Sequence, residues 1–173
     1  MANPAADAHV ARLCPACGLC CDSTLFADVE LRLADDPQKL AKQGLTLSPK
    51  GRGKLAFAQP CPAFDGQLCG IYADRPVRCR QFHCGLLQRV EAKKMTPAAA
   101  LKIIATAKKQ AGEVRRLLVL LGQKDERRAL THRYAEAMSA PLDLANPEQA
   151  ELHGTLMLTV SDLMHLLQRH FLQ

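Results

Sequence analysis

Eight cysteines are the residues of this 173-residue chain most able to do chemistry, and they are clustered. They follow the pattern C-x2-C-x2-C-C and, 39 residues later, C-x7-C-x9-C-x4-C: Cys14, Cys17, Cys20, Cys21, Cys61, Cys69, Cys79 and Cys84. A C-x2-C turn lets two sulfurs converge on one centre, as in zinc and iron–sulfur sites. The first residues show no secretory signal, so we expect a cytoplasmic protein whose thiols stay reduced. Clustered cysteines in such a protein indicate metal binding rather than disulfides.

Two details of the spacing favour iron–sulfur chemistry. Closely spaced Cys14, Cys17 and Cys20, together with a Cys61-Pro62 pair, are typical of part of the ferredoxin ligand run. Adjacent side chains in extended backbone point to opposite sides, so Cys20 and Cys21 are predicted to serve different centres. We hypothesise two sets of four: Cys14, Cys17, Cys20 and Cys61 in one, and Cys21, Cys69, Cys79 and Cys84 in the other. Zinc is the alternative metal, because four-cysteine zinc sites use the same spacings.

Three arginines near the last cysteines are candidate cofactor-binding residues. Arg75, Arg78 and Arg80 could neutralise a thiolate-rich centre or donate hydrogen bonds to its sulfurs. The alternative is that they are solvated loop charges, or that they pair with Asp65 and Asp74. No catalytic residue is assigned from the sequence.

These segments resemble a known family. The strings CPACGLCC, CPAF and CGIYADRPVRCRQFHC are similar to the CxxCxxCC, or YkgJ-like, cysteine-cluster proteins, which are described as zinc- or iron-chelating and often as iron–sulfur proteins. The resemblance covers about residues 14–85 and implies that all eight cysteines form the metal site. One departure is His83, where the family commonly has proline; it is either a further ligand or a neighbour of the ligands. Tyr72 is interpreted as a core residue.

The pattern along the chain predicts an α+β fold. A strand is expected over 24–33, a short helix over 37–43, and short strands over 45–47 and 54–57, followed by a loop over 61–85 that metal ligands hold together. Helices are expected over 96–122 and 124–138 and from Asn146 onward, packed antiparallel. We therefore expect a cysteine-rich metal-bound α+β unit over 1–85 and a helical part over 86–173 that packs on it.

The formal net charge is +6, and residues 86–138 carry the excess, with 12 lysines and arginines against 5 aspartates and glutamates. The pairs Lys108–Lys109 and Arg115–Arg116 have spacings typical of solvated helix faces. Aromatic residues that could stack on bases are nearly absent from this segment, so nucleic-acid binding has weak support. No run approaches the roughly 18 uncharged apolar residues that a membrane span needs, so no membrane association is expected.

Three functional hypotheses follow from these patterns. The leading one is a protein that holds iron–sulfur clusters or iron through its eight cysteines, with a redox or metal-dependent modification role and a redox or protein partner. The rival is a zinc-binding structural module with two four-cysteine sites and a basic helical surface that binds a partner. The third is an enzyme with an open metal position. No Walker loop, Rossmann glycine pattern or HExxH helix supports a nucleotide-binding or peptidase function.

Overall fold

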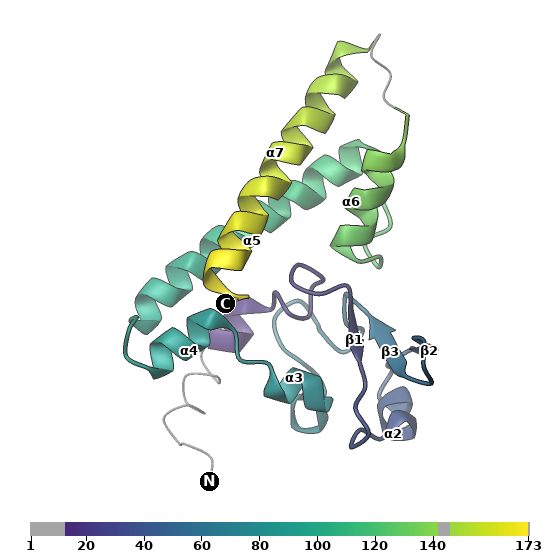
Figure 1. The fold of residues 1–173 in the computed structure, drawn as a ribbon, viewed down its shortest axis with the longest axis vertical. Helices are drawn as coiled ribbons and strands as arrows, with labels where there is room; N and C mark the ends of the chain where they lie inside the picture. Colours follow the sequence, from purple (N-terminus) through teal and green to yellow (C-terminus); the bar gives the residue numbers. More distant parts are fainter. Residues whose placement is uncertain (1–12, 142–145, 173) are drawn as a thin grey trace.

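The computed structural model describes residues 13–141 and 146–172 (Figure 1). The first described residues, 13–17, are helical. The elements that follow are β1 (Asp28–Glu30), α2 (Pro37–Lys42), β2 (Leu47–Pro49), β3 (Leu55–Ala58), the 3-10 turn η1 (Tyr72–Asp74), α3 (Val77–Gln81), α4 (Gly85–Glu91), α5 (Pro97–Leu120), α6 (Leu130–Ser139) and α7 (Pro147–His170). Helices and a small separate sheet confirm the predicted α+β class.

The three strands form an antiparallel sheet in the order β1-β3-β2. Phe57 on the central strand lies opposite Val29 on one side and Leu47 on the other, and it is buried. Alternation places this ring on the face that packs into a small core. That core contains Val29, Leu31, Leu40, Leu45, Phe57 and Cys61. The sheet therefore brings an apolar cluster directly against one of the cysteines.

The predicted strand over 24–33 is shorter in the structure because local turns occupy both of its ends. Asp22 accepts a hydrogen bond from the backbone N–H of Thr24, and Asp35 accepts one from the backbone N–H of Arg32. Such side-chain bonds compete with a strand ladder. The next predicted strand, 45–47, is displaced to Leu47–Pro49, whereas the strand over 54–57 is found at Leu55–Ala58.

Proline after a capping side chain starts each of the longest helices, as the sequence predicts. Thr96 accepts a hydrogen bond from the backbone N–H of Ala99 at the start of α5, and Asn146 accepts one from Gln149 at the start of α7. Helix α6 begins later than predicted, because Asp125 accepts from the backbone N–H of Arg127 and forms a turn before it. The short helix α3 lies within the segment 61–85 that was expected to be a loop. The short helix α4 precedes the first helix that was predicted for the helical part.

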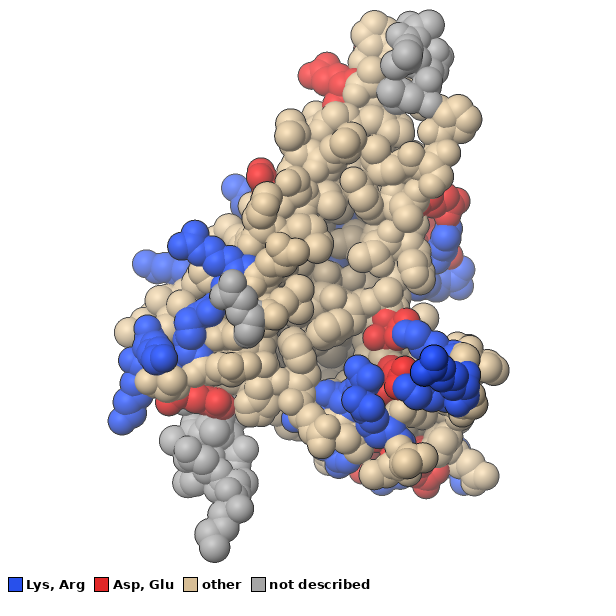
Figure 2. Space-filling view, in the orientation of Figure 1, with Lys and Arg blue, Asp and Glu red and all other residues tan. Residues whose placement is uncertain are grey.

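Helices α5 and α7 run antiparallel and cross along the upper part of the molecule, with α6 beside them and the sheet below (Figure 1). Their main core includes Leu13 and Leu19 from the cysteine segment, so the helices and that segment share buried contacts. The division into units 1–85 and 86–173 stays a prediction. Lysines and arginines gather around the α4–α5 corner and over the sheet, while the visible face of α7 is largely uncharged (Figure 2). None of the helices in the described ranges has the length and apolar character to cross a membrane.

Candidate metal centre

The first cysteine segment curls around Gly18. Cys14 and Cys17 lie on the helical turn 13–17, and the backbone N–H of Gly18 donates 3.1 Å to the carbonyl oxygen of Cys14. Gly18 has φ of +71°, and a Cβ at this position would lie 2.6 Å from Cζ of Phe64. Only glycine meets both demands, because other residues resist this backbone conformation and their Cβ would clash with the ring. Glycine at this position therefore allows the turn that separates Cys14 and Cys17 from Cys20.

Four thiols form the first set: Cys14, Cys17, Cys20 and Cys84. Cys84 immediately precedes α4, and both it and Cys17 pack against the main helical core. Burial raises the pKa of Cys17 to about 12, and the nearby Cys84 and Cys14 also act to raise it. Burial likewise raises the pKa of Cys20, with contributions from Cys17, its neighbour Cys21, Cys14 and Cys84. This mutual influence places the four sulfurs in one neighbourhood.

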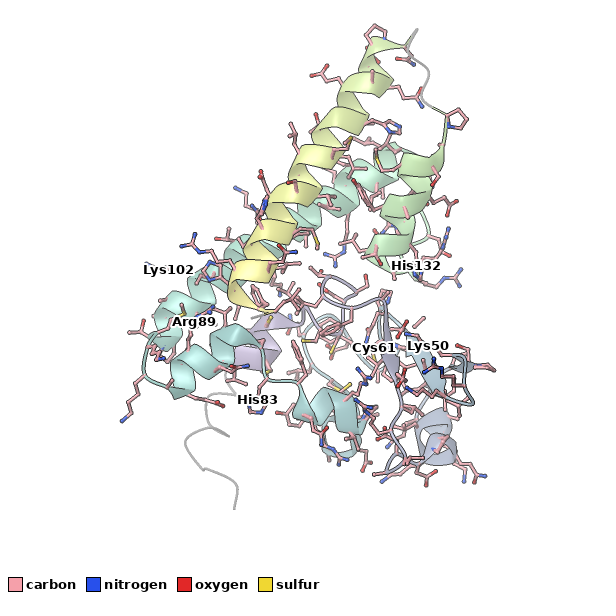
Figure 3. All side chains as sticks on the ribbon, viewed as in Figure 1. Lys50, Cys61, His83, Arg89, Lys102 and His132 are labelled. Carbon is pink, nitrogen blue, oxygen red and sulfur yellow. The ribbon has the colours of Figure 1, made fainter. Side chains whose placement is uncertain are left out.

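The remaining four thiols form the second set: Cys21, Cys61, Cys69 and Cys79. The backbone N–H of Cys61 donates 2.8 Å to the carbonyl oxygen of Cys21, and Cys69 forms an isolated β-bridge with Phe64. Cys79 lies on α3. Burial raises the pKa of Cys21 to about 12 and that of Cys79 to about 11, and in both cases Cys61 and Cys69 raise it further. Figure 3 shows sulfur atoms gathered between α3, the amino-terminal helical segment and β1.

The packing of the cysteines differs from the hypothesised sets in one respect, because Cys61 and Cys84 exchange places. Cys61 packs in the sheet core with Cys21 and Cys79, whereas Cys84 packs in the helical core with Cys17. The two cores, which sequence spacing does not reveal, decide the assignment. That Cys20 and Cys21 serve different centres stays a prediction, because Cys21 is among the groups that raise the pKa of Cys20.

Of the three candidate arginines, Arg75 is the one whose charge influences cysteines of both sets. Its charge acts to lower the pKa of Cys14 in the first set and of Cys79 in the second, against the larger effect of burial. Its guanidinium also lies 3.7 Å from the centre of the Tyr72 ring. Tyr72 is 43% exposed, so its interpretation as a core residue is wrong: the ring covers an arginine at the surface.

Arg78 and Arg80 point toward carboxylates. Arg78 lies 3.5 Å from Glu30, and the charge of Arg80 contributes to lowering the pKa of Asp74, after the larger effect of hydrogen bonds from Lys39 and Gln43. Pairing with carboxylates at exposed positions is the alternative to cofactor binding for these arginines. Their role toward a bound cofactor stays a prediction.

His83 is exposed beside Cys84 and lies 3.7 Å from Glu91 through its Nδ1 (Figure 3). Asp65 caps its own turn by accepting from the backbone N–H groups of Gln67 and Leu68. His83 is thus a neighbour of a set rather than a member of it, and Asp65 is engaged locally.

The chemistry of both donor sets fits a thiophilic metal. All eight cysteines are free thiols. Four-sulfur sites suit zinc or iron–sulfur clusters, and buried thiols with raised pKa values are protonated until a cation displaces their protons. Within the described residues, no group of three or more His, Cys, Asp or Glu side chains is close enough to hold a metal ion. The two sets are therefore groups of neighbouring thiols rather than formed coordination sites.

Sequence reasoning missed a clamp on the loop that follows Cys21. Arg115 on α5 donates to the carbonyl oxygen of Asp22 at 2.9 Å and to Thr24 Oγ1 at 2.8 Å, and it lies 3.0 Å from the Asp22 carboxylate. Ser23 Oγ accepts from the backbone N–H of Leu130 at the start of α6. Arg115 is therefore no solvated face residue. Its only signal in the sequence is its place in a helix, which does not reveal a partner 91 residues away.

Comparisons with known proteins bear on these cysteines. The family model CxxCxxCC, described as a "Putative zinc- or iron-chelating domain", matches residues 13–111. The matched range contains both cysteine sets and Arg75, and it extends into α5. Neither the curated proteins nor the solved structures give a significant match to the chain.

Proposed function

This chain belongs to the CxxCxxCC family, and from that premise we propose that it is a cytoplasmic protein that holds two iron–sulfur clusters, one in each set of four cysteines. The clusters would supply one-electron redox chemistry when bound. The protein would then exchange electrons with a redox partner or use a cluster in modifying a substrate. Zinc in the same two sets, with a structural role, is the competing assignment.

One observation carries the proposal of clusters: the way the C-x2-C-x2-C-C run divides between the sets. In the bacterial ferredoxin run, three closely spaced cysteines serve one cluster and the fourth serves the other. Here Cys17 packs with remote Cys84 against the helical core, while Cys21 packs with Cys61 and Cys79 in the sheet core. A run divided in this way supports one cluster on each side, although its last spacing is shorter than in the ferredoxin run.

The surroundings of the sets are suited to a buried anionic centre. Thiolates in this environment need compensating positive charge, because burial disfavours their charged form. Arg75 acts on a cysteine of each set, so it can stabilise negative charge in both. Charge and hydrogen bonding around cluster sulfurs are main determinants of reduction potential. Arg75 would therefore tune the two centres together.

The test is to purify the full chain anaerobically and measure metal by mass spectrometry, acid-labile sulfide and the visible spectrum. Iron with equimolar labile sulfide and a broad absorption band supports the proposal. Zinc at integral stoichiometry without a visible band replaces it with the structural zinc assignment. Iron without labile sulfide also contradicts it and indicates an iron centre bound directly by thiolates. In a cluster-loaded protein, Arg75→Gln should make both centres harder to reduce, because a nearby positive charge is lost.

A further inference from the structure

A hollow of about 440 Å³ lies beside the first cysteine set, where α5 and α6 meet the cysteine-rich segments. Its lining has three parts. Cys17 and residues 22–23 form one wall, residues 60 and 64–66 form a second that includes Pro60 and Phe64, and Lys108, Arg115, Glu126 and Arg133 complete it from the helical part. Hollows at the junction of two structural parts are common ligand sites.

Arg133 is the reason to expect a ligand here. Its side chain on α6 is only 2% exposed. One guanidinium nitrogen donates to the carbonyl oxygen of Gln123, but Nε finds no acceptor in the described part of the chain. The ion pairs found among the described residues do not include Arg133. The charges of Glu126 and Asp125 partly offset the effect of burial on the pKa of Arg133, but neither carboxylate forms an ion pair with it in the described part of the chain. A buried cation compensated only at a distance is costly, so an anionic group with an acceptor for Nε would stabilise it.

The other charges of the hollow leave room for that anion. Arg115 and Asp22 neutralise each other, and Asp65 accepts hydrogen bonds within its own turn. Lys108 is exposed, and its Nζ has only a long contact of 3.4 Å with the carbonyl oxygen of Ala16. Glu126 is exposed and lines the same hollow, where its charge favours the protonated Arg133 and opposes an incoming anion. Lys108 and Arg133 are thus the cations that a ligand can engage.

We propose that this hollow binds an organic carboxylate, with its carboxylate between Arg133 and Lys108 and its apolar part against Phe64 and Pro60. The apolar wall favours an organic acid over inorganic phosphate, which has no surface to bury there. Because Cys17 lines the same hollow, the bound acid would lie at the edge of the first cysteine set. The site uses residues outside both cysteine sets for recognition, so it does not depend on which metal they hold.

The probe is benzoate, with benzamide as its neutral counterpart, titrated by calorimetry into the full-length protein as purified. Saturable binding of benzoate without comparable binding of benzamide is expected. Lys108→Gln should weaken benzoate binding about threefold, as for an exposed charge pair. Lys109→Gln is the matched control, because this lysine follows directly on α5 and does not line the hollow. Glu126→Gln should tighten binding, since it removes the opposing charge at the rim.

Arg133→Gln should weaken benzoate binding by about tenfold or more, provided that helical circular dichroism shows it folded. If this variant does not fold, the variants at the exposed Lys108 and Glu126 test the proposal instead. The proposal is overturned if benzoate does not bind saturably, or if benzamide binds with equal affinity. It is also overturned if Lys108→Gln and Lys109→Gln have equal effects, or if inorganic phosphate competes equally strongly. Metal content is measured on the same samples, so that a failure of benzoate binding can be distinguished from a failure of the cluster assignment.

Discussion

The backbone N–H of Cys61 donates a 2.8 Å hydrogen bond to the carbonyl oxygen of Cys21. This bond joins the end of the first cysteine run to the beginning of the second, and Cys61 packs with Cys21 in the sheet core. Cys17, four residues earlier, packs instead with Cys84 against the helical core. The first cysteine run therefore links the two sets, and the two cores separate them.

This division predicts how metal loss combines between serine variants. Cys14→Ser and Cys84→Ser should each lower the metal content by emptying the first set, and the double variant should lose no more than either alone. Combining Cys84→Ser with Cys61→Ser should remove metal from both sets, because independent sites add and members of one site do not. Metal per chain is measured by mass spectrometry. Additive loss in Cys14→Ser with Cys84→Ser would instead return Cys84 to the second set.

Gly18 should tolerate no side chain. Gly18→Ala places a Cβ 2.6 Å from Phe64 Cζ at φ of +71°, so we expect a loss of about 1–3 kcal/mol in the free energy of unfolding, together with weaker metal retention in the first set. Urea denaturation and metal analysis measure the two effects.

The control for that variant is Gly112→Ala on α5, where nothing lies within 4 Å of the added Cβ. Removing a helix-interior glycine should stabilise the protein by about 0.5–1 kcal/mol. If both alanine variants have similar stability, the turn around Gly18 is not the constraint that we describe.

Arg115 should matter to stability far more than its neighbour Arg116. Arg115→Met breaks the contacts to the Asp22 carbonyl and to Thr24 Oγ1, at a cost of about 1.5–3 kcal/mol for bonds to a charged group. Among the described residues, Arg116 pairs with Glu113 alone, one turn earlier on the same exposed face, so Arg116→Met should cost less than about 1 kcal/mol. Chemical denaturation of both variants gives the comparison, and equal losses would argue against the clamp.

Features of the fold that depend on neighbouring residues could be predicted from the sequence. Thr96-Pro97 and Asn146-Pro147 start helices where predicted, since a capping side chain and a proline suffice to define a first turn. The clustering of the cysteines likewise predicts a shared site, and the CxxCxxCC family match supports that prediction.

Tertiary packing determined what the sequence left open. Whether Cys61 or Cys84 completes the first set depends on which core each enters, and the spacing of the cysteines contains no information on that. Tyr72 lies at the surface, where Arg75 stacks on its ring, and the buried position of Arg133 follows from where α6 packs. Long-range contacts of this kind have no local signature.

His170 near the end of α7 should make stability depend on pH. Burial lowers its pKa below the ordinary value, and the charges of Arg89 and Arg169 lower it further. An Arg89 nitrogen lies 3.3 Å from His170 Nδ1 and donates 2.9 Å to its carbonyl oxygen, so a protonated imidazole would face a guanidinium. Because the pKa of His170 is lower in the folded than in the unfolded state, neutral His170 contributes to stability. That contribution is complete above the unfolded-state pKa near 6.5 and is lost as pH falls through the folded-state pKa.

We therefore expect the free energy of unfolding to fall between pH 7 and pH 5 by more in the native protein than in His170→Gln, which keeps an acceptor near Arg89 but does not titrate. Carboxylates titrate in both proteins, so the difference between their pH profiles isolates the imidazole. His165→Gln, an exposed substitution on the same helix, should retain the native pH profile. Urea denaturation at several pH values measures all three, and a native-like profile in His170→Gln would show that the contact with Arg89 does not couple to folding.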